Sequence, residues 1–135
     1  MSDKDYSATP LWKKLGIKDG GKVAIVRSPR EVSIPIPPGA QLLATPRKGT
    51  DVIVVFETRL GRLEKAFRSL KPKLAPDGGL WVAYPKKSSA IATDLTFEDV
   101  QRLGLGAGLV DNKSCAIDAE WSGVRFVYRL KDRPA

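Results

Sequence analysis

Basic and hydroxyl side chains directly follow three apolar segments of the chain. Residues 23–26, 51–56 and 80–84 are apolar runs typical of buried strands. The side chains after them that suit an anion are Arg27, Ser28, Thr58, Arg59, Lys86, Lys87 and Ser88. Ligands of open α/β sheets bind beyond the carboxyl ends of the strands. The pattern therefore predicts a site for a phosphate or carboxylate group at this edge of the sheet.

Two further expectations concern the middle one of these three segments. Thr58 is placed to cap a helix that begins near Arg59, and the free N–H groups of that helix would favour an anion. The alternative is that all these polar residues are solvated loop residues, with Glu57 paired to Arg59 or to Arg27. The sequence leaves both interpretations open.

The residue types narrow the chemistry available to the chain. There is no histidine, which removes the commonest general base near neutral pH and the commonest zinc ligand. Cys115 is the single cysteine and falls in an expected strand, so we predict a packed, inert thiol. The acidic residues Asp94, Glu98, Asp99, Asp111 and Asp118 are scattered over caps and strand ends. We therefore expect no catalytic residue, no metal site and no cofactor, and favour a protein that is not an enzyme.

Length and composition fit one domain with an anionic partner. The chain has 135 residues, 42% of them hydrophobic and 28% charged, with a formal net charge of +8. The positive excess lies in residues 1–30 and 61–90. A single cysteine, a polar start and the lack of a long apolar run predict a cytoplasmic protein that does not enter a membrane. We expect a flexible segment over residues 1–8 and one domain over residues 9–135.

The N-terminal third contains a short helix and a long irregular stretch. Thr9 and Pro10 suit the N-cap and first position of a helix, and Gly16 suits its stop. Four prolines between Pro29 and Pro38 exclude a regular helix there. Residues 40–44 suit a short strand.

The rest of the chain alternates helices and strands. Apolar residues at three- and four-residue spacing predict a helix from about Arg59 to Lys71, with a basic outer face made of Arg62, Lys65, Arg68 and Lys71. A tight Asp77-Gly78-Gly79 turn would lead into the strand over residues 80–84. A capping box at Thr96 begins a second helix, and two strands over about 113–118 and 124–129 close the chain. The basic face offers an alternative, weak nucleic-acid association, which is less favoured than a solvated surface.

Aromatic residues add expectations about burial. Trp12 and Trp81 are predicted to be core anchors, and Phe97 to lie on the buried side of its helix. Trp121 is the aromatic residue that we expect to be exposed. The order of elements predicts a mostly parallel α/β sheet with one antiparallel edge strand.

This order resembles class I S-adenosylmethionine-dependent methyltransferases over roughly Leu15 to Arg129. The similar segments are "LGIKDGGKVAIV", "DVIVVF", the helix ending "LKPKLAPDGGLWVAYP", "EDVQRLGLGAGLV" and the closing hairpin. The resemblance implies a Rossmann-like, methyltransferase-like sheet. At a finer level "TPLWKKLGI", "DGGLWVAYPKKSS", "ATDLT", "GLVD" and "EWSGVRFV" resemble a family of small bacterial proteins classed as a domain of unknown function.

The chain departs from the methyltransferase pattern where the cofactor would bind. In that family a glycine-rich loop follows the first strand, but here the chain reads Val26-Arg27-Ser28-Pro29. The helix expected before the second strand is replaced by "SPREVSIPIPPGA". We therefore predict a non-catalytic binding module for an anionic small molecule or a protein partner. The alternatives are a degenerate S-adenosylmethionine-binding protein and a weak nucleic-acid binder, and the oligomeric state is open.

Overall fold

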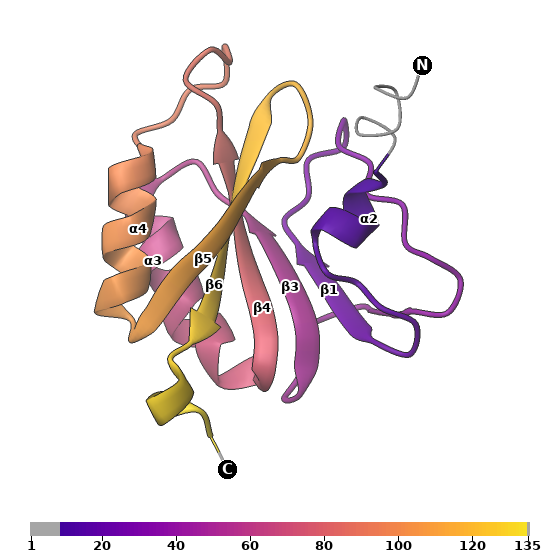
Figure 1. The fold of residues 1–135 in the computed structure, drawn as a ribbon. Coiled ribbons are helices and arrows are strands. Elements are labelled where there is room, and N and C mark those ends of the chain that lie inside the picture. Colours follow the sequence, from indigo (N-terminus) through magenta and orange to yellow (C-terminus); the bar gives the residue numbers. More distant parts are fainter. Residues whose placement is uncertain (1–8, 135) are drawn as a thin grey trace.

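A six-stranded sheet in the order β2-β1-β3-β4-β6-β5 organises the fold (Figure 1). The computed structural model describes residues 9–134, so the expectation for residues 1–8 lies outside the described residues. The strands are β1 Lys22–Val26, β2 Gln41–Leu43, β3 Thr50–Phe56, β4 Leu74–Pro85, β5 Leu109–Ala116 and β6 Trp121–Tyr128. The helices are α2 Leu11–Lys14, α3 Leu60–Leu70 and α4 Phe97–Gly106, with short 3-10 turns η1 Lys71–Lys73 and η2 Leu130–Asp132.

Strand direction follows the predicted class. Strands β2, β1, β3 and β4 pair in parallel, and β6 pairs antiparallel with both β4 and β5. The mostly parallel sheet with an antiparallel C-terminal hairpin is therefore confirmed. One detail was wrong: the antiparallel strand β6 is not at the edge, because β5 crosses over and forms the edge beyond it.

Apolar side chains fill both faces of the sheet. On one face α3 and α4 cover a core in which Phe67 and Phe126 meet edge to face, with ring centroids 5.1 Å apart. On the other face α2 and the proline-rich stretch pack against a second core around Trp81. The Trp81 indole N–H donates to the Leu15 carbonyl at 2.9 Å, which ties the α2 segment to the centre of the sheet. Figure 1 shows α2 in front of the sheet and α3 behind it.

Helix ends agree with the sequence at most positions. Gly16 stops the first helix with φ +82°, and the Thr96–Asp99 capping box begins α4. The Thr9 cap was wrong by one residue: Pro10 itself is the extended N-cap of α2, so the helix starts at Leu11. Residues 29–38 contain no regular helix, as the prolines require.

Two aromatic predictions were wrong. Trp121 is only 5% exposed, because β6 already begins there and its ring meets Phe56 edge to face at 5.1 Å. Phe97 is 38% exposed at the first position of α4, which follows the irregular segment 86–96.

The Asp77-Gly78-Gly79 turn is instead an irregularity inside β4. The pairing with β3 shifts from Thr50–Leu74 to Val52–Gly79, so β4 carries extra residues between these points. A Cβ on Gly78 would lie 2.6 Å from the Asp51 carbonyl oxygen, so only glycine allows this close approach of the two strands.

Candidate functional site

The chain changes direction in the sheet between β1 and β3. From β1 it proceeds to β2 on one side and then returns to β3 on the other. Ligands of open α/β sheets bind at such a point, outside the carboxyl ends of the two strands. Arg27 follows β1 here and Glu57 follows β3.

Arg27 and Glu57 form an ion pair across this point. The Arg27 Nε atom lies 3.3 Å from Glu57 Oε2. The Glu57 side chain is 3% exposed, whereas the Arg27 side chain is 54% exposed, so the guanidinium lies over the carboxylate. Arg27 has φ +58°, a left-handed backbone conformation that favours glycine.

Glu57 is a strongly constrained carboxylate. Burial raises its pKa, and the charges of Arg27 and Arg62 oppose that shift. Its backbone N–H donates to the Ala83 carbonyl of β4 at 3.0 Å, which fixes the residue against the neighbouring strand. Within residues 9–134, Oε2 accepts no hydrogen bond. The space between β1 and β3 therefore holds a buried acid with one cation above it.

The amino end of α3 is occupied by another carboxylate. The Leu60 N–H donates to Asp94 Oδ1 at 2.8 Å, and no side chain of the preceding residues caps the helix. The expectation that Thr58 caps α3 was wrong, because Thr58 instead uses its carbonyl to accept from Thr93 Oγ1 and the Asp94 N–H. Asp94 thus takes the place that an external anion would occupy at this helix end.

A large hollow opens beyond the carboxyl end of β4. Its volume is about 640 Å³, and Lys86 and Lys87 both line it. The Ser89 N–H donates to the Lys86 carbonyl at 2.9 Å, which closes a turn around the two lysines. Two hydrogen bonds hold the turn to the β5–β6 connection. The Lys86 N–H donates to the Glu120 carbonyl, and the Ser89 hydroxyl donates to the Glu120 carboxylate. The position of the lysines therefore depends on the C-terminal hairpin.

The wall opposite the lysines comes from the start of α4. Thr96, Phe97 and Glu98 line the hollow, as does Ser122 of β6. Burial raises the pKa of Tyr84, and the charge of Glu98 raises it further, so the phenol stays protonated near neutral pH. The sequence analysis missed these wall residues. The capping box located the start of α4, but nothing in the sequence placed it beside Lys86.

The seven residues predicted from the sequence occupy different places. Lys86 and Lys87 line the large hollow, while Arg27 lines a smaller one of about 210 Å³ beside α3. Ser88 is exposed, and Ser89 lines the hollow next to it. The remaining three lie near the ends of β1 and β3, with Ser28 and Arg59 exposed and Thr58 half-buried.

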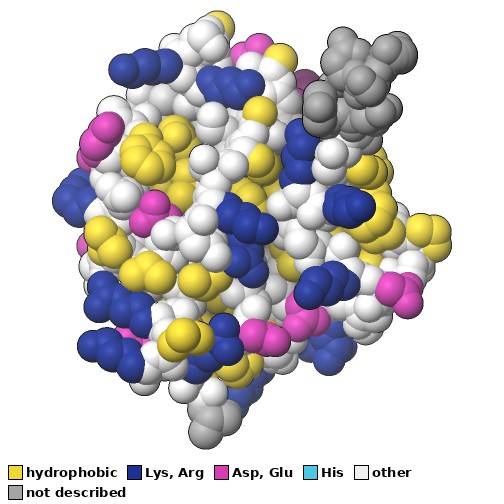
Figure 2. Space-filling model, viewed as in Figure 1, with side chains coloured by type: hydrophobic (Ala, Val, Ile, Leu, Met, Phe, Trp, Pro, Cys, Tyr) yellow, Lys and Arg dark blue, Asp and Glu magenta, His cyan; other side chains and the backbone are white. Residues whose placement is uncertain are grey.

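The basic face of α3 is divided between two surroundings. Arg62 and Lys65 line the small hollow beside Arg27, and Arg68 lies between α3 and α4. The Lys71 ammonium donates to the Ala107 carbonyl at 2.6 Å, at the carboxyl end of α4. On the face that carries α2, Figure 2 shows Lys and Arg side chains scattered among acidic and apolar ones.

Outside these hollows, we considered a reactive thiol, a metal site and a membrane-spanning helix. Burial raises the pKa of Cys115, with Lys14 opposing the shift, which makes the thiol a weak nucleophile at neutral pH. Across residues 9–134, no group of three or more potential ligands among His, Cys, Asp and Glu could hold a metal ion. In that same part of the chain, every helix is too short or too polar to cross a bilayer.

Comparison with known proteins supports the fold. No protein-family model and no curated protein matches the sequence. The mitomycin 7-O-methyltransferase MmcR is a similar solved structure, with a TM-score of 0.61 and 13% identity over 92% of this chain and 54% of that one. The fold is methyltransferase-like.

Two further solved structures agree. LepI in complex with SAM has a TM-score of 0.57 and 12% identity, over 92% of this chain and 48% of that one. The Methanococcus jannaschii fibrillarin pre-rRNA processing protein has a TM-score of 0.56 and 11% identity, over 95% of this chain and 76% of that one. This chain thus spans about half the length of LepI and MmcR. At these identities the likeness concerns the fold alone.

Proposed function

We propose that the chain is a non-catalytic binding domain that holds an anionic small molecule in the hollow beyond β4. The observation that carries the proposal is the pair of lysines lining a 640 Å³ hollow at the carboxyl end of a central strand. That volume lies within the range of about 300 to 1,000 Å³ common for small-molecule sites. Lys86 and Lys87 supply the charge that attracts the anion.

The other residues that line the hollow indicate what the rest of the ligand should be. Ile91 and Phe97 are apolar, and Phe97 keeps 38% of its surface exposed. Tyr84 offers a protonated hydroxyl beside them. An anionic group joined to a flat or apolar body suits this combination, because the ring and aliphatic surfaces bury the body while the ammonium groups hold the charge.

The surroundings of β1 favour this hollow over the place where the methyltransferase-like fold would hold a nucleoside. Arg27 covers Glu57 there, and the hollow beside Arg27 measures about 210 Å³, compared with about 640 Å³ beyond β4. A ligand between β1 and β3 would have to displace the guanidinium and leave the buried carboxylate without its cation.

Thermal shift followed by calorimetry tests the proposal. The panel contains nucleotides, phosphorylated metabolites, aromatic carboxylates and S-adenosylmethionine. We expect at least one anion to stabilise the protein and S-adenosylmethionine to give a flat titration. Lys86→Ala/Lys87→Ala should weaken the binding of that anion at least tenfold, because charge-assisted contacts are lost.

A double variant with the same charge change elsewhere provides the control. Lys113→Ala/Lys131→Ala removes two exposed lysines that lie outside the hollow. Unchanged affinity in this control and reduced affinity in the Lys86/Lys87 variant would support the site. Equal affinity in both variants, or no response to any anion, would overturn the proposal.

A further inference from the structure

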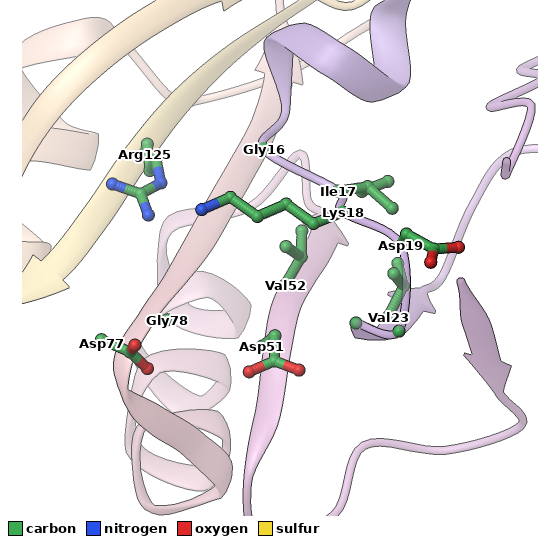
Figure 3. A pocket seen from close by; sticks show the side chains of 12 residues that line it. Gly16, Ile17, Lys18, Asp19, Val23, Asp51, Val52, Asp77, Gly78 and Arg125 are labelled. Atoms are coloured by element: carbon green, nitrogen blue, oxygen red, sulfur yellow. The ribbon is translucent and has the colours of Figure 1, made fainter. Parts of the chain in front are cut away.

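A second hollow, of about 280 Å³, opens near the amino ends of β1 and β3, at the opposite end of the sheet from Lys86 (Figure 3). Its rim is the α2–β1 loop, with glycines at positions 16, 20 and 21. Gly78 of β4 and Arg125 of β6 also line it. Because glycine has no side chain, a ligand can approach the backbone closely at these positions.

Arg125 is a half-buried cation on β6, which lies between β4 and β5 and is antiparallel to both. Its guanidinium lies over Gly79, where any Cβ would collide with it. Burial lowers the pKa of Arg125, and among the described residues no carboxylate forms an ion pair with it. Partial removal of a charge from water without a counter-charge is unfavourable.

Lys18 adds a second cation at the same place. Figure 3 shows its side chain extended across the hollow with the ammonium pointing toward the Arg125 guanidinium. The neighbouring carboxylate of Asp19 is turned away and lies against Gly39. Two like charges therefore face each other with no described acid between them, an arrangement that an anion would stabilise.

The other side of the hollow carries acceptors. Asp51 and Asp77 lie there, apart from the two cations (Figure 3). One Asp51 oxygen accepts from the Lys22 N–H at 2.9 Å, which leaves its second oxygen for another donor. Carboxylates at this position suit hydroxyl groups of a ligand.

We propose that this hollow binds a small phosphate monoester that carries hydroxyl groups. The phosphate lies between Lys18 and Arg125, and the hydroxyls donate to Asp51 and Asp77. A guanidinium paired with an ammonium is a strong phosphate receptor. The 280 Å³ volume limits the ligand to a small one. This site is separate from the hollow beyond β4 and does not depend on the function proposed there.

Calorimetric titration with inorganic phosphate and with ribose 5-phosphate at low ionic strength tests the site. We expect saturable binding of both, with ribose 5-phosphate several-fold tighter because of its hydroxyls. Lys18→Gln and Arg125→Gln should each weaken binding at least tenfold. Lys113→Gln/Lys131→Gln should leave it unchanged, because these two lysines are exposed and line neither this hollow nor the one beyond β4.

Two further variants keep the test independent of folding. Gly79→Ala pushes the guanidinium aside while retaining its charge, and should also weaken phosphate binding. Asp77→Ala should remove the advantage of ribose 5-phosphate over inorganic phosphate. Without ligand, Arg125→Gln should melt at the same or a higher temperature than the wild type, because a half-buried cation is removed. Flat titrations, or equal affinities in the wild type, Lys18→Gln and Gly79→Ala, would overturn the proposal.

Discussion

Arg27 combines a strained backbone with an ion pair. Its φ of +58° costs a residue other than glycine about 1 to 2 kcal/mol. The guanidinium reaches the buried Glu57 carboxylate at 3.3 Å. The backbone at this position thus has a conformation that favours glycine. The Arg27 side chain occupies the space beside Glu57 that would be empty if the residue were glycine.

Two substitutions of Arg27 separate these contributions. Arg27→Ala should lower the free energy of unfolding by about 1 to 2 kcal/mol, less than for a fully buried pair because Arg27 is half exposed. Arg27→Gly should be less destabilising by about 1 kcal/mol, because glycine tolerates the left-handed conformation. Urea unfolding at pH 7.5 measures both, with Arg30→Ala as an exposed control. Equal effects of all three substitutions would contradict this account.

Glu57 should make stability depend on pH. Burial raises its pKa above the value of 4.5 expected in the unfolded chain, so the folded state binds the proton more tightly. The free energy of unfolding should therefore fall as the pH rises from about 4.5 through the folded pKa. Glu57→Gln should remove this part of the slope, and its stability relative to the wild type should increase across that range.

Denaturation of both proteins between pH 4.5 and 8 measures this difference. Asp99 does not interfere, because its hydrogen bonds to Arg102 and Thr96 lower its pKa. Its contribution to the pH dependence of stability therefore lies at a more acidic pH than this range. A stability difference between wild type and Glu57→Gln that stays constant with pH would contradict the assignment.

At the scale of elements, the segment from Lys86 to Thr96 joins three parts of the fold. It caps α3 through Asp94, hydrogen-bonds to the loop between β3 and α3 through Thr93, and reaches the hairpin through Ser89. The same segment also lines the hollow beyond β4, so these hydrogen bonds hold one wall of that hollow in place.

Asp94→Ala tests this connection. It should lower the free energy of unfolding by about 1 kcal/mol, the usual effect of losing a helix cap. Thr58→Ala is the matched control and should change stability by less than about 0.5 kcal/mol, since its side chain does not cap the helix. Chemical denaturation measures both, and a larger effect of Thr58→Ala would show that the cap is misassigned.

The sequence predicted elements better than their ends. The periodicity of α3 and the apolar runs of β1, β3 and β4 located these elements, because one buried face dominates each pattern. The cap of α3 lies 34 residues further along the chain, so no local pattern contains it. Trp121 and Phe97 were misjudged because exposure at the end of an element depends on the neighbours that the fold brings there.

At the scale of the molecule, the fold class followed from the order of elements, and similar solved structures agree with it. The candidate site followed only in part. The sequence placed three polar segments after β1, β3 and β4, and these three strands are neighbours in the sheet. It could not show that Arg27 and Lys86 line different hollows, or that α4 forms the wall opposite the lysines.

The most direct test of the central claim is a ¹H–¹⁵N NMR titration with the anion that gives the largest thermal shift, compared with S-adenosylmethionine. We expect the anion to move the amide signals of residues 84–89 and 96–98, and S-adenosylmethionine to leave the spectrum unchanged. Saturable shifts of Arg27, Ser28 and Glu57 on addition of S-adenosylmethionine, with residues 84–89 unaffected by every anion, would contradict the account.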